Sequence, residues 1–283
     1  MNVKITRWIS YMVLVFATSA LLLVGCGEDT KGTYSVTIVT EGGMALEDIT
    51  VRIYTDDSKE NQVAMGITDE TGKISFESDG AIGCIMELQN VPTGYQVEET
   101  YEIKEMITDI VLKTELLSIE DLSEITFALG DVFADLSVEA TDGKQYTISE
   151  LLKEKKAIVL NFWYLNCSPC KMEFPYLQEA YEDYQDEVEV IALNPLDGDN
   201  PTIAKYQQDL GLTFPMAACD SIWEQAMKIS AYPTTVVIDR YGTVAFIHRG
   251  YVTETETFTK IFDYFVAEDY KQTTIRNLED LDK

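Results

Sequence analysis

Two cysteines separated by two residues, Cys167 and Cys170, lie between a largely apolar run at residues 157–164 and a predicted helix at 168–184. An apolar run of this kind is typical of a strand that is buried on both faces of a sheet. The pair therefore lies where a central strand meets a helix N-terminus, whose free N–H groups and dipole stabilise a thiolate. We predict that Cys167 is the nucleophile and Cys170 the resolving thiol of a disulfide-exchange pair.

The alternatives for the pair are a static disulfide and one half of a zinc site. Structural zinc takes four ligands, mostly Cys and His, and the chain holds one histidine, His248, and no second paired cysteine motif. Pro169 fits the first helical turn without the loss of a hydrogen bond. We therefore predict that the site needs no metal and no cofactor, and that its redox group is the Cys167–Cys170 disulfide itself.

Strand and helix patterns alternate in the C-terminal half of the chain. Predicted strands lie at 157–164, 188–193, 235–238 and 243–247, and predicted helices at 147–152, 168–184, 202–210, 221–229 and 255–267. Strands that alternate with helices indicate an α/β sandwich. The segment from residue 268 onward is polar, and we expect it to be loose.

At these residues the chain resembles the TlpA/ResA group of extracytoplasmic thioredoxin-like proteins, over about residues 127–267. Beside the cysteine pair, the residues that carry the resemblance are Asn161-Phe162-Trp163, Lys171, Glu173, Pro175 and Tyr232-Pro233-Thr234-Thr235. The resemblance implies an α/β thioredoxin fold for a domain at 127–270, with protein-disulfide reductase activity. One departure is Asn166, because the family often has Trp directly before the first cysteine.

The resemblance also implies roles for four further residues. Pro233 matches a cis-proline loop that lies against the dithiol, and Tyr232 and Trp163 are expected beside it on the substrate-binding side. Glu173 matches a family acid that takes or gives the proton of the resolving thiol, and on a helix it shares a face with Cys170. The alternatives are an ordinary trans proline at Pro233, a solvated acid in the first helical turn at Glu173, and a plain core residue at Trp163.

A different pattern occupies residues 33–114. Apolar and polar residues alternate at 34–38 and 49–53, and turn sequences recur every 8–12 residues or so, which favours a β-sandwich. Residues 66–76 and 91–95 resemble the Cna B-type repeat of surface adhesins and related prealbumin-like modules. The resemblance implies an N-terminal all-β Ig/prealbumin-like sandwich. Because the first strand has no Lys and the last has no Asn, we do not expect the isopeptide bond of such modules, and we predict a spacer or docking surface.

The first 25 residues have the pattern of a lipoprotein signal peptide. Lys4 and Arg7 precede an apolar run at 9–24, which is shorter than the ~20 residues of a bilayer span. The run ends in Leu23-Val24-Gly25-Cys26, which is similar to a bacterial lipobox in which Cys26 receives the lipid. Acyl chains would then hold the protein at the extracytoplasmic face of the cell membrane, through a tether at 26–32. The alternative is an uncleaved N-terminal anchor with an incidental Cys26.

The composition excludes one class of partner. The formal net charge is −28, whereas nucleic-acid binding requires Lys and Arg to displace counterions, so we predict no nucleic acid. Cys84 and Cys219 each stand alone in the sequence, and we expect single thiols that act as small buried side chains. A linker at 115–126 and a polar tail at 271–283 complete the predicted domain organisation.

Together these features predict a membrane-anchored extracytoplasmic thiol–disulfide oxidoreductase that reduces protein disulfides. The resemblance implies disulfide-bearing extracytoplasmic proteins as substrates and a membrane electron donor of the thiol-relay type. The alternatives are a copper chaperone on a thioredoxin fold, a peroxidase, and a surface binding protein with a vestigial redox domain. The copper group spaces its cysteines one residue wider and uses a His, and a peroxidase uses an isolated Cys, so the spacing favours the reductase.

Overall fold

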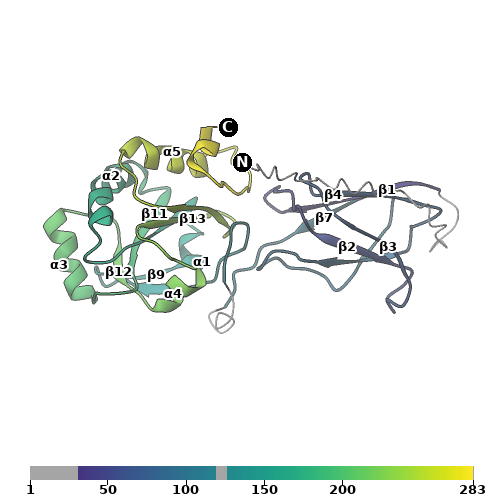
Figure 1. Ribbon diagram of the computed structural model, residues 1–283, viewed down its shortest axis with the longest axis horizontal. Coiled ribbons are helices and arrows are strands. Elements are labelled where there is room, and N and C mark those ends of the chain that lie inside the picture. Colours follow the sequence, from purple (N-terminus) through teal and green to yellow (C-terminus); the bar gives the residue numbers. More distant parts are fainter. Residues whose placement is uncertain (1–30, 119–125, 283) are drawn as a thin grey trace, which may run out of the picture.

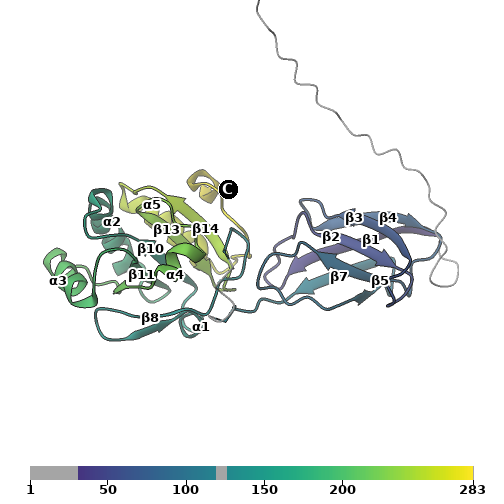
Figure 2. The ribbon, with the colours of Figure 1, turned by 60° about the horizontal axis from the view of Figure 1, so that its bottom comes forward.

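The computed structural model describes residues 31–118 and 126–282 of the chain. Two parts lie side by side along the long axis of the molecule, and Figures 1 and 2 show both from two directions. The N-terminal β part contains β1 to β7, and the C-terminal α/β part contains β8 to η2. The predicted signal peptide, the predicted lipid-attachment residue Cys26 and most of the predicted linker lie outside the described residues.

The N-terminal β part consists of two sheets with the strand orders β4-β1-β7 and β3-β2-β5-β6. Strand β1 is antiparallel to β4 and parallel to β7. The strands are β1 (Gly32–Thr40), β2 (Thr50–Tyr54), β3 (Gln62–Ile67), β4 (Lys73–Ser78), β5 (Ile85–Gln89), β6 (Tyr101–Glu102) and β7 (Ile107–Leu112).

Alternation of apolar residues explains why these two sheets share one core. Val36 and Ile38 of β1 and Ile53 of β2 are almost fully buried, and they belong to a single hydrophobic cluster with Met86 of β5 and Ile110 of β7. Because the cluster draws on strands of both sheets, the period-2 pattern in the sequence marks the faces that turn inward.

The C-terminal α/β part is built on a five-stranded sheet with the order β12-β11-β10-β13-β14. The first three strands are parallel, and β13 and β14 are antiparallel to their neighbours. The elements are β8 (Ser137–Glu139), β9 (Gln145–Thr147), α1 (Ile148–Leu151), β10 (Ala157–Phe162), α2 (Ser168–Tyr184), β11 (Val188–Asn194), α3 (Asn200–Leu210), β12 (Met216–Ala218), α4 (Ser221–Ala226), β13 (Thr234–Asp239), β14 (Val244–Arg249), α5 (Thr255–Val266) and the 3₁₀ helix η2 (Leu278–Asp282).

The continuous apolar character of β10 follows from its place at the centre of this sheet. Val159 packs in a cluster with residues of α2 and α5, whereas Ile158 and Leu160 pack in a second cluster with residues of α1 and α4. Both faces of the strand are therefore covered, and every residue of β10 is buried. This is the α/β sandwich expected from the sequence.

The segment after α5 is packed, so the prediction of a loose tail from residue 268 is wrong. Tyr270, Gln272 and Ile275 are buried, and Ile275 forms a β-bridge with Phe246 of β14. The segment looks loose in the sequence because most of its residues are polar, and the partners of its buried side chains lie far away in the chain.

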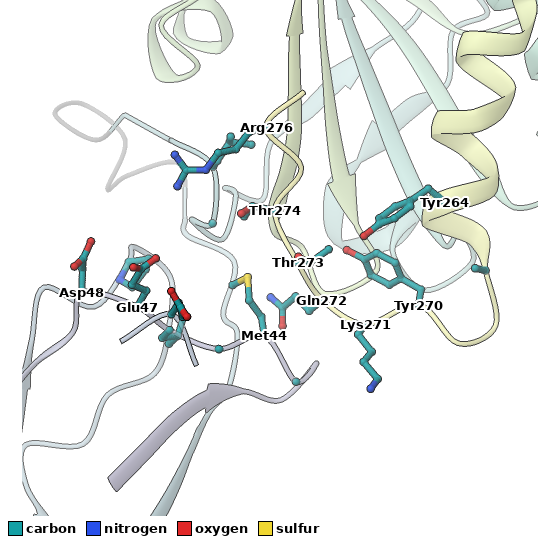
Figure 3. A pocket seen from close by; sticks show the side chains of 18 of the residues that line it. Met44, Glu47, Asp48, Tyr264, Tyr270, Lys271, Gln272, Thr273, Thr274 and Arg276 are labelled. Carbon is teal, nitrogen blue, oxygen red and sulfur yellow. The ribbon is translucent and has the colours of Figure 1, made fainter. Parts of the chain in front are cut away.

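This segment also touches the N-terminal β part. The backbone N–H of Gln272 donates to the carbonyl oxygen of Gly42 at 3.1 Å, and Val132 of the C-terminal part is buried in the N-terminal core cluster. A pocket of about 860 Å³ lies between the loop that contains Met44 and the segment that contains Lys271 and Gln272 (Figure 3).

The two cysteines outside the pair differ from one another. Cys84 is buried in the N-terminal core and is disulfide-bonded, so the prediction of a single thiol there is wrong. Cys219 is the free cysteine of the described residues and is partly buried. Burial and the nearby Asp220 raise the pKa of the Cys219 thiol to about 12, which keeps it protonated and unreactive. Across residues 31–118 and 126–282, none of the helices is both long enough and apolar enough to cross a bilayer.

Candidate active site

Cys167 and Cys170 lie where the chain leaves the central strand β10 and enters α2. Cys167 is the N-cap residue of this helix, and its Sγ accepts a hydrogen bond from the backbone N–H of Cys170 at 3.1 Å. Pro169 lies in the first helical turn, where its missing N–H is not needed. The sulfur of Cys167 thus receives one of the N–H groups that a helix N-terminus leaves free, and such a contact stabilises a thiolate.

The two cysteines are joined by a disulfide, with their Cα atoms 5.3 Å apart. Both side chains are almost completely covered, with exposed fractions of 1% for Cys167 and 0% for Cys170. The pair predicted from the sequence is therefore in its oxidised form. The helix position of Cys167 distinguishes the two sulfurs, whereas their burial does not.

Glu173 follows Cys170 by three residues on α2, and its side chain is fully buried. Its Oε1 accepts a hydrogen bond from Nδ2 of Asn161 at 2.8 Å, and its Oε2 accepts one from the backbone N–H of Val252 at 2.7 Å. Burial raises the pKa of Glu173 to about 7, and the two hydrogen bonds oppose that rise. The alternative expectation, a solvated acid in the first helical turn, is wrong because no part of this side chain reaches solvent.

Pro233 comes directly before β13, and the Tyr232–Pro233 peptide bond is cis, as expected. The carbonyl oxygen of Pro233 accepts a hydrogen bond from the backbone N–H of Gly250 at 3.0 Å. Tyr232 is partly exposed, and its ring meets that of Tyr164 edge to face with 5.4 Å between centroids. Tyr232 packs against the same hydrophobic cluster that contains both cysteines.

Trp163 is fully buried in that cluster. Its ring packs edge to face on Phe174 and stacks on Tyr206, with centroid distances of 5.3 and 5.1 Å. The Nζ of Lys171 lies over the Tyr206 ring, 5.2 Å from its centroid. Trp163 therefore fits the core alternative at least as well as a contact with substrate.

The structure adds two groups to which the sequence assigned no role, Asn161 and the backbone N–H of Val252. Both hold the carboxylate of Glu173. A signal for Asn161 was available, because it is the one polar residue of the apolar strand β10. Val252 gave no such signal, because it contributes only a backbone atom and lies 79 residues from Glu173.

The described residues contain no group of three or more His, Cys, Asp and Glu side chains that is arranged to hold a metal ion. His248 lies on β14 opposite Thr235 of β13, and its ring stacks on Phe246. The chemistry that the arrangement supports is thiol–disulfide exchange at a cysteine pair that shares its helix with a buried carboxyl group.

Comparison with known proteins identifies the same chemistry. Residues 129–247 match the AhpC/TSA family. The chain is 31% identical over 127 residues to the thiol-disulfide oxidoreductase ResA of Halalkalibacterium halodurans, covering 44% of this chain and 70% of that protein. It is 34% identical over 134 residues to ResA of Oceanobacillus iheyensis, covering 45% and 68%.

A solved structure, that of a thioredoxin-family thiol:disulfide interchange protein from Chlorobium tepidum TLS, aligns with a TM-score of 0.41 and 23% identity over 51% of this chain and 99% of that one. The ResA relatives align over about two thirds or more of their own length. The chain therefore belongs to the ResA-like thiol–disulfide oxidoreductases, with a thioredoxin-fold domain of the AhpC/TSA family.

Proposed function

We propose that the chain is a membrane-anchored extracytoplasmic reductase of protein disulfides, in which Cys167 attacks the substrate and Cys170 resolves the intermediate. The observation that carries this proposal is the position of Cys167 at the N-cap of α2, in a disulfide with Cys170. Cys170 in turn lies about one helical turn before the buried Glu173. Disulfide-bearing extracytoplasmic proteins are the proposed substrates.

The reaction starts from the reduced pair. The Cys167 thiolate attacks one sulfur of the substrate disulfide, forms a mixed disulfide and releases the other substrate sulfur as a thiolate. The Cys170 thiol then passes its proton to the carboxylate of Glu173, attacks Sγ of Cys167 and releases the second substrate sulfur. The substrate disulfide gains two electrons, and the protein is left with the Cys167–Cys170 disulfide.

The proposed direction is reduction. Ser168 and Pro169 place no cationic side chain between the cysteines, and the carboxyl group of Glu173 disfavours a second negative charge nearby when it is ionised. Both features favour the oxidised pair over the dithiolate. Because extracytoplasmic compartments tend to oxidise thiols, the pair requires an electron donor, which we assign to a membrane protein of the thiol-relay type.

The anchor and the N-terminal β part complete the proposal. Residues 1–25 are the proposed signal peptide and Cys26 the proposed lipid-attachment residue, supported by the lipobox-like sequence 23–26. The proposed module at 33–114 is a Cna B-type, Ig/prealbumin-like sandwich, supported by its two sheets around one core. It acts as a spacer or docking surface, a linker at 115–126 joins it to the thioredoxin-like domain at 127–270, and 271–283 follow as a C-terminal segment.

A turnover assay with a fluorescent glutathione disulfide probe tests the proposal. Reduced wild-type protein should cleave the probe, and Cys167→Ser should not. Cys219→Ser is the matched control, because Cys219 is a free cysteine outside the pair. It should retain wild-type activity. Cleavage by Cys167→Ser at the wild-type rate would exclude the proposed nucleophile.

A further inference from the structure

Asn161 is a fully buried polar residue in the middle of the central strand β10. Its Nδ2 donates to Oε1 of Glu173 at 2.8 Å and to Oγ1 of Thr235 at 3.2 Å. Its other polar atom, Oδ1, is buried and has no hydrogen-bond partner. A buried amide oxygen without a partner costs free energy, so this one requires a physical reason.

The reason lies in the two protonation states of Glu173. An ionised carboxylate only accepts hydrogen bonds, so it requires the NH₂ end of Asn161 to face it. A protonated carboxyl group has an O–H donor, and an NH₂ group cannot accept it. The end of the Asn161 amide that faces Glu173 must therefore depend on whether Glu173 carries its proton.

The second oxygen of Glu173 fixes where that proton is placed. Oε2 is bound to the backbone N–H of Val252, which can donate but cannot accept. Oε1 faces the Asn161 amide, whose Oδ1 can accept from an O–H group, so we place the proton of the carboxylic acid on Oε1. Thr235 places no constraint on the amide, because its hydroxyl group both donates and accepts.

We propose that Asn161 is a positioning residue for Glu173, whose amide presents Nδ2 to the ionised carboxylate and turns by half a rotation to present Oδ1 when Oε1 is protonated. The inference rests on the proposed role of Glu173 as the proton acceptor for Cys170. The amide turn lets Glu173 take and return a proton without moving its oxygens.

Of the two hydrogen-bond partners of Glu173, Asn161 contributes a side chain that can rotate, whereas Val252 contributes a backbone N–H. Burial raises the pKa of Glu173 to about 7, and the contacts that lower it are those from Val252 and Asn161. The packed elements carry further titratable groups, among them Lys171 and Tyr176 on α2, Asp239 at the far end of β13, and His248 and Arg249 on β14, whereas β10 has none. None of these groups contributes to the shift in the pKa of Glu173, which comes from burial and the two hydrogen bonds. Burial lowers the pKa of His248.

The direct test is side-chain NMR of the full chain between about pH 5 and about pH 9, a range that brackets the midpoint of Glu173. The ¹⁵N and ¹H signals of the Asn161 NH₂ group should move with the same midpoint as the ¹³C carboxyl signal of Glu173. They should stop moving in Glu173→Gln. Asn161 signals that stay constant while Glu173 titrates would overturn the inference.

A variant pair adds a second readout. Asn161→Leu removes the donor to the carboxylate, so the midpoint of Glu173 should rise by about one unit or more. Thr235→Val is the matched control, because it removes the other partner of Asn161 and leaves the Asn161–Glu173 contact in place. In this variant the titration midpoint of Glu173 should stay close to the wild-type value. An unchanged midpoint in a folded Asn161→Leu protein would also refute the inference.

These outcomes separate the inference from the proposed function. If the wild-type protein reduces the glutathione disulfide probe but Asn161 and Glu173 do not titrate together, the inference fails and the reductase remains. If they titrate together but the protein cleaves no disulfide, the contact is real and the reductase proposal fails.

Discussion

Gln272 donates a hydrogen bond through Nε2 to the hydroxyl group of Tyr95 at 3.1 Å, across 177 positions of sequence. The same side chain accepts a hydrogen bond from the hydroxyl group of Thr40 and donates one to that of Thr243. Thr40 and Tyr95 belong to the N-terminal β part, and Thr243 belongs to the C-terminal α/β part. A residue close to the C-terminus therefore ties the two parts together from within a buried network.

We expect Gln272→Leu to weaken this connection. The substitution leaves up to three buried hydroxyl groups short of a partner, with a loss of unfolding free energy on the order of 2 kcal/mol. Urea unfolding followed separately in the two parts should show their transitions moving apart. The matched control is Lys271→Ala, because Lys271 is exposed and next in sequence. Equal unfolding free energies for Gln272→Leu and Lys271→Ala would contradict the role of Gln272.

Local patterns in the sequence predict some features of the fold and of the site and miss others. The buried strand β10 and the cysteine pair at the start of α2 were predictable, because apolar runs and short spacings are local signals. The packing of Gln272 was not, because Thr40 lies 232 residues away and the local composition is polar. The burial of Glu173 was equally hidden, since an acid near a helix N-terminus is also favoured in a solvated position.

The order of the thiols gives a second prediction. Cys170→Ser should accumulate mixed disulfides with substrates through Cys167, because the resolving sulfur is gone. Cys167→Ser should accumulate few, because Cys170 lies inside the helix and lacks the N-cap position. Non-reducing gels and peptide mass spectrometry measure the adducts. More adducts on Cys167→Ser than on Cys170→Ser would reverse the assignment.

The lipid anchor gives a third prediction. Cys26→Ala should block lipid attachment and leave an unprocessed precursor in the cell, because the lipobox-like cleavage requires the modified cysteine. Mass spectrometry of the N-terminal peptide from the mature wild-type protein checks the modification directly. An unmodified Cys26 in the mature protein would exclude the anchor.

The buried carboxyl group of Glu173 makes stability depend on pH. The unfolded chain loses this proton near the ordinary pKa of 4.5, whereas the folded protein holds it up to about 7. Between these values the folded state binds more protons, so the unfolding free energy falls as the pH rises. At about 1.4 kcal/mol per unit, the Glu173 contribution is on the order of 3 kcal/mol.

Glu173→Gln should remove the Glu173 contribution to the fall of the unfolding free energy with pH. The variant should be more stable than the wild type above about pH 7. The remaining slope between about pH 4 and about pH 6 belongs in part to Asp239, whose pKa burial raises to about 6. Denaturant unfolding at several pH values measures both slopes. The matched control is Glu179→Gln on the exposed face of α2, and a wild-type slope in Glu173→Gln would contradict the assignment.

The reduction potential gives the last prediction, because it decides the direction of the reaction. Strong oxidants stabilise their reduced thiolate and reach about −120 mV, whereas thioredoxin lies near −270 mV. In this protein the extra stabilisation of a Cys167 thiolate comes from the helix N-terminus, with no cationic side chain between the cysteines, and an ionised Glu173 opposes it. We therefore expect a potential below about −180 mV, on the reducing side of protein disulfide isomerase.

Because burial raises the pKa of Glu173 to about 7, its charge is present above that pH and absent well below it. Glu173→Gln should accordingly raise the potential at about pH 8, by an amount on the order of 30 mV, and change it little at about pH 5.5. Equilibration with glutathione buffers measures both values. A wild-type potential above about −180 mV would instead assign the chain to disulfide formation, and the electron donor proposed for the membrane would then be an acceptor.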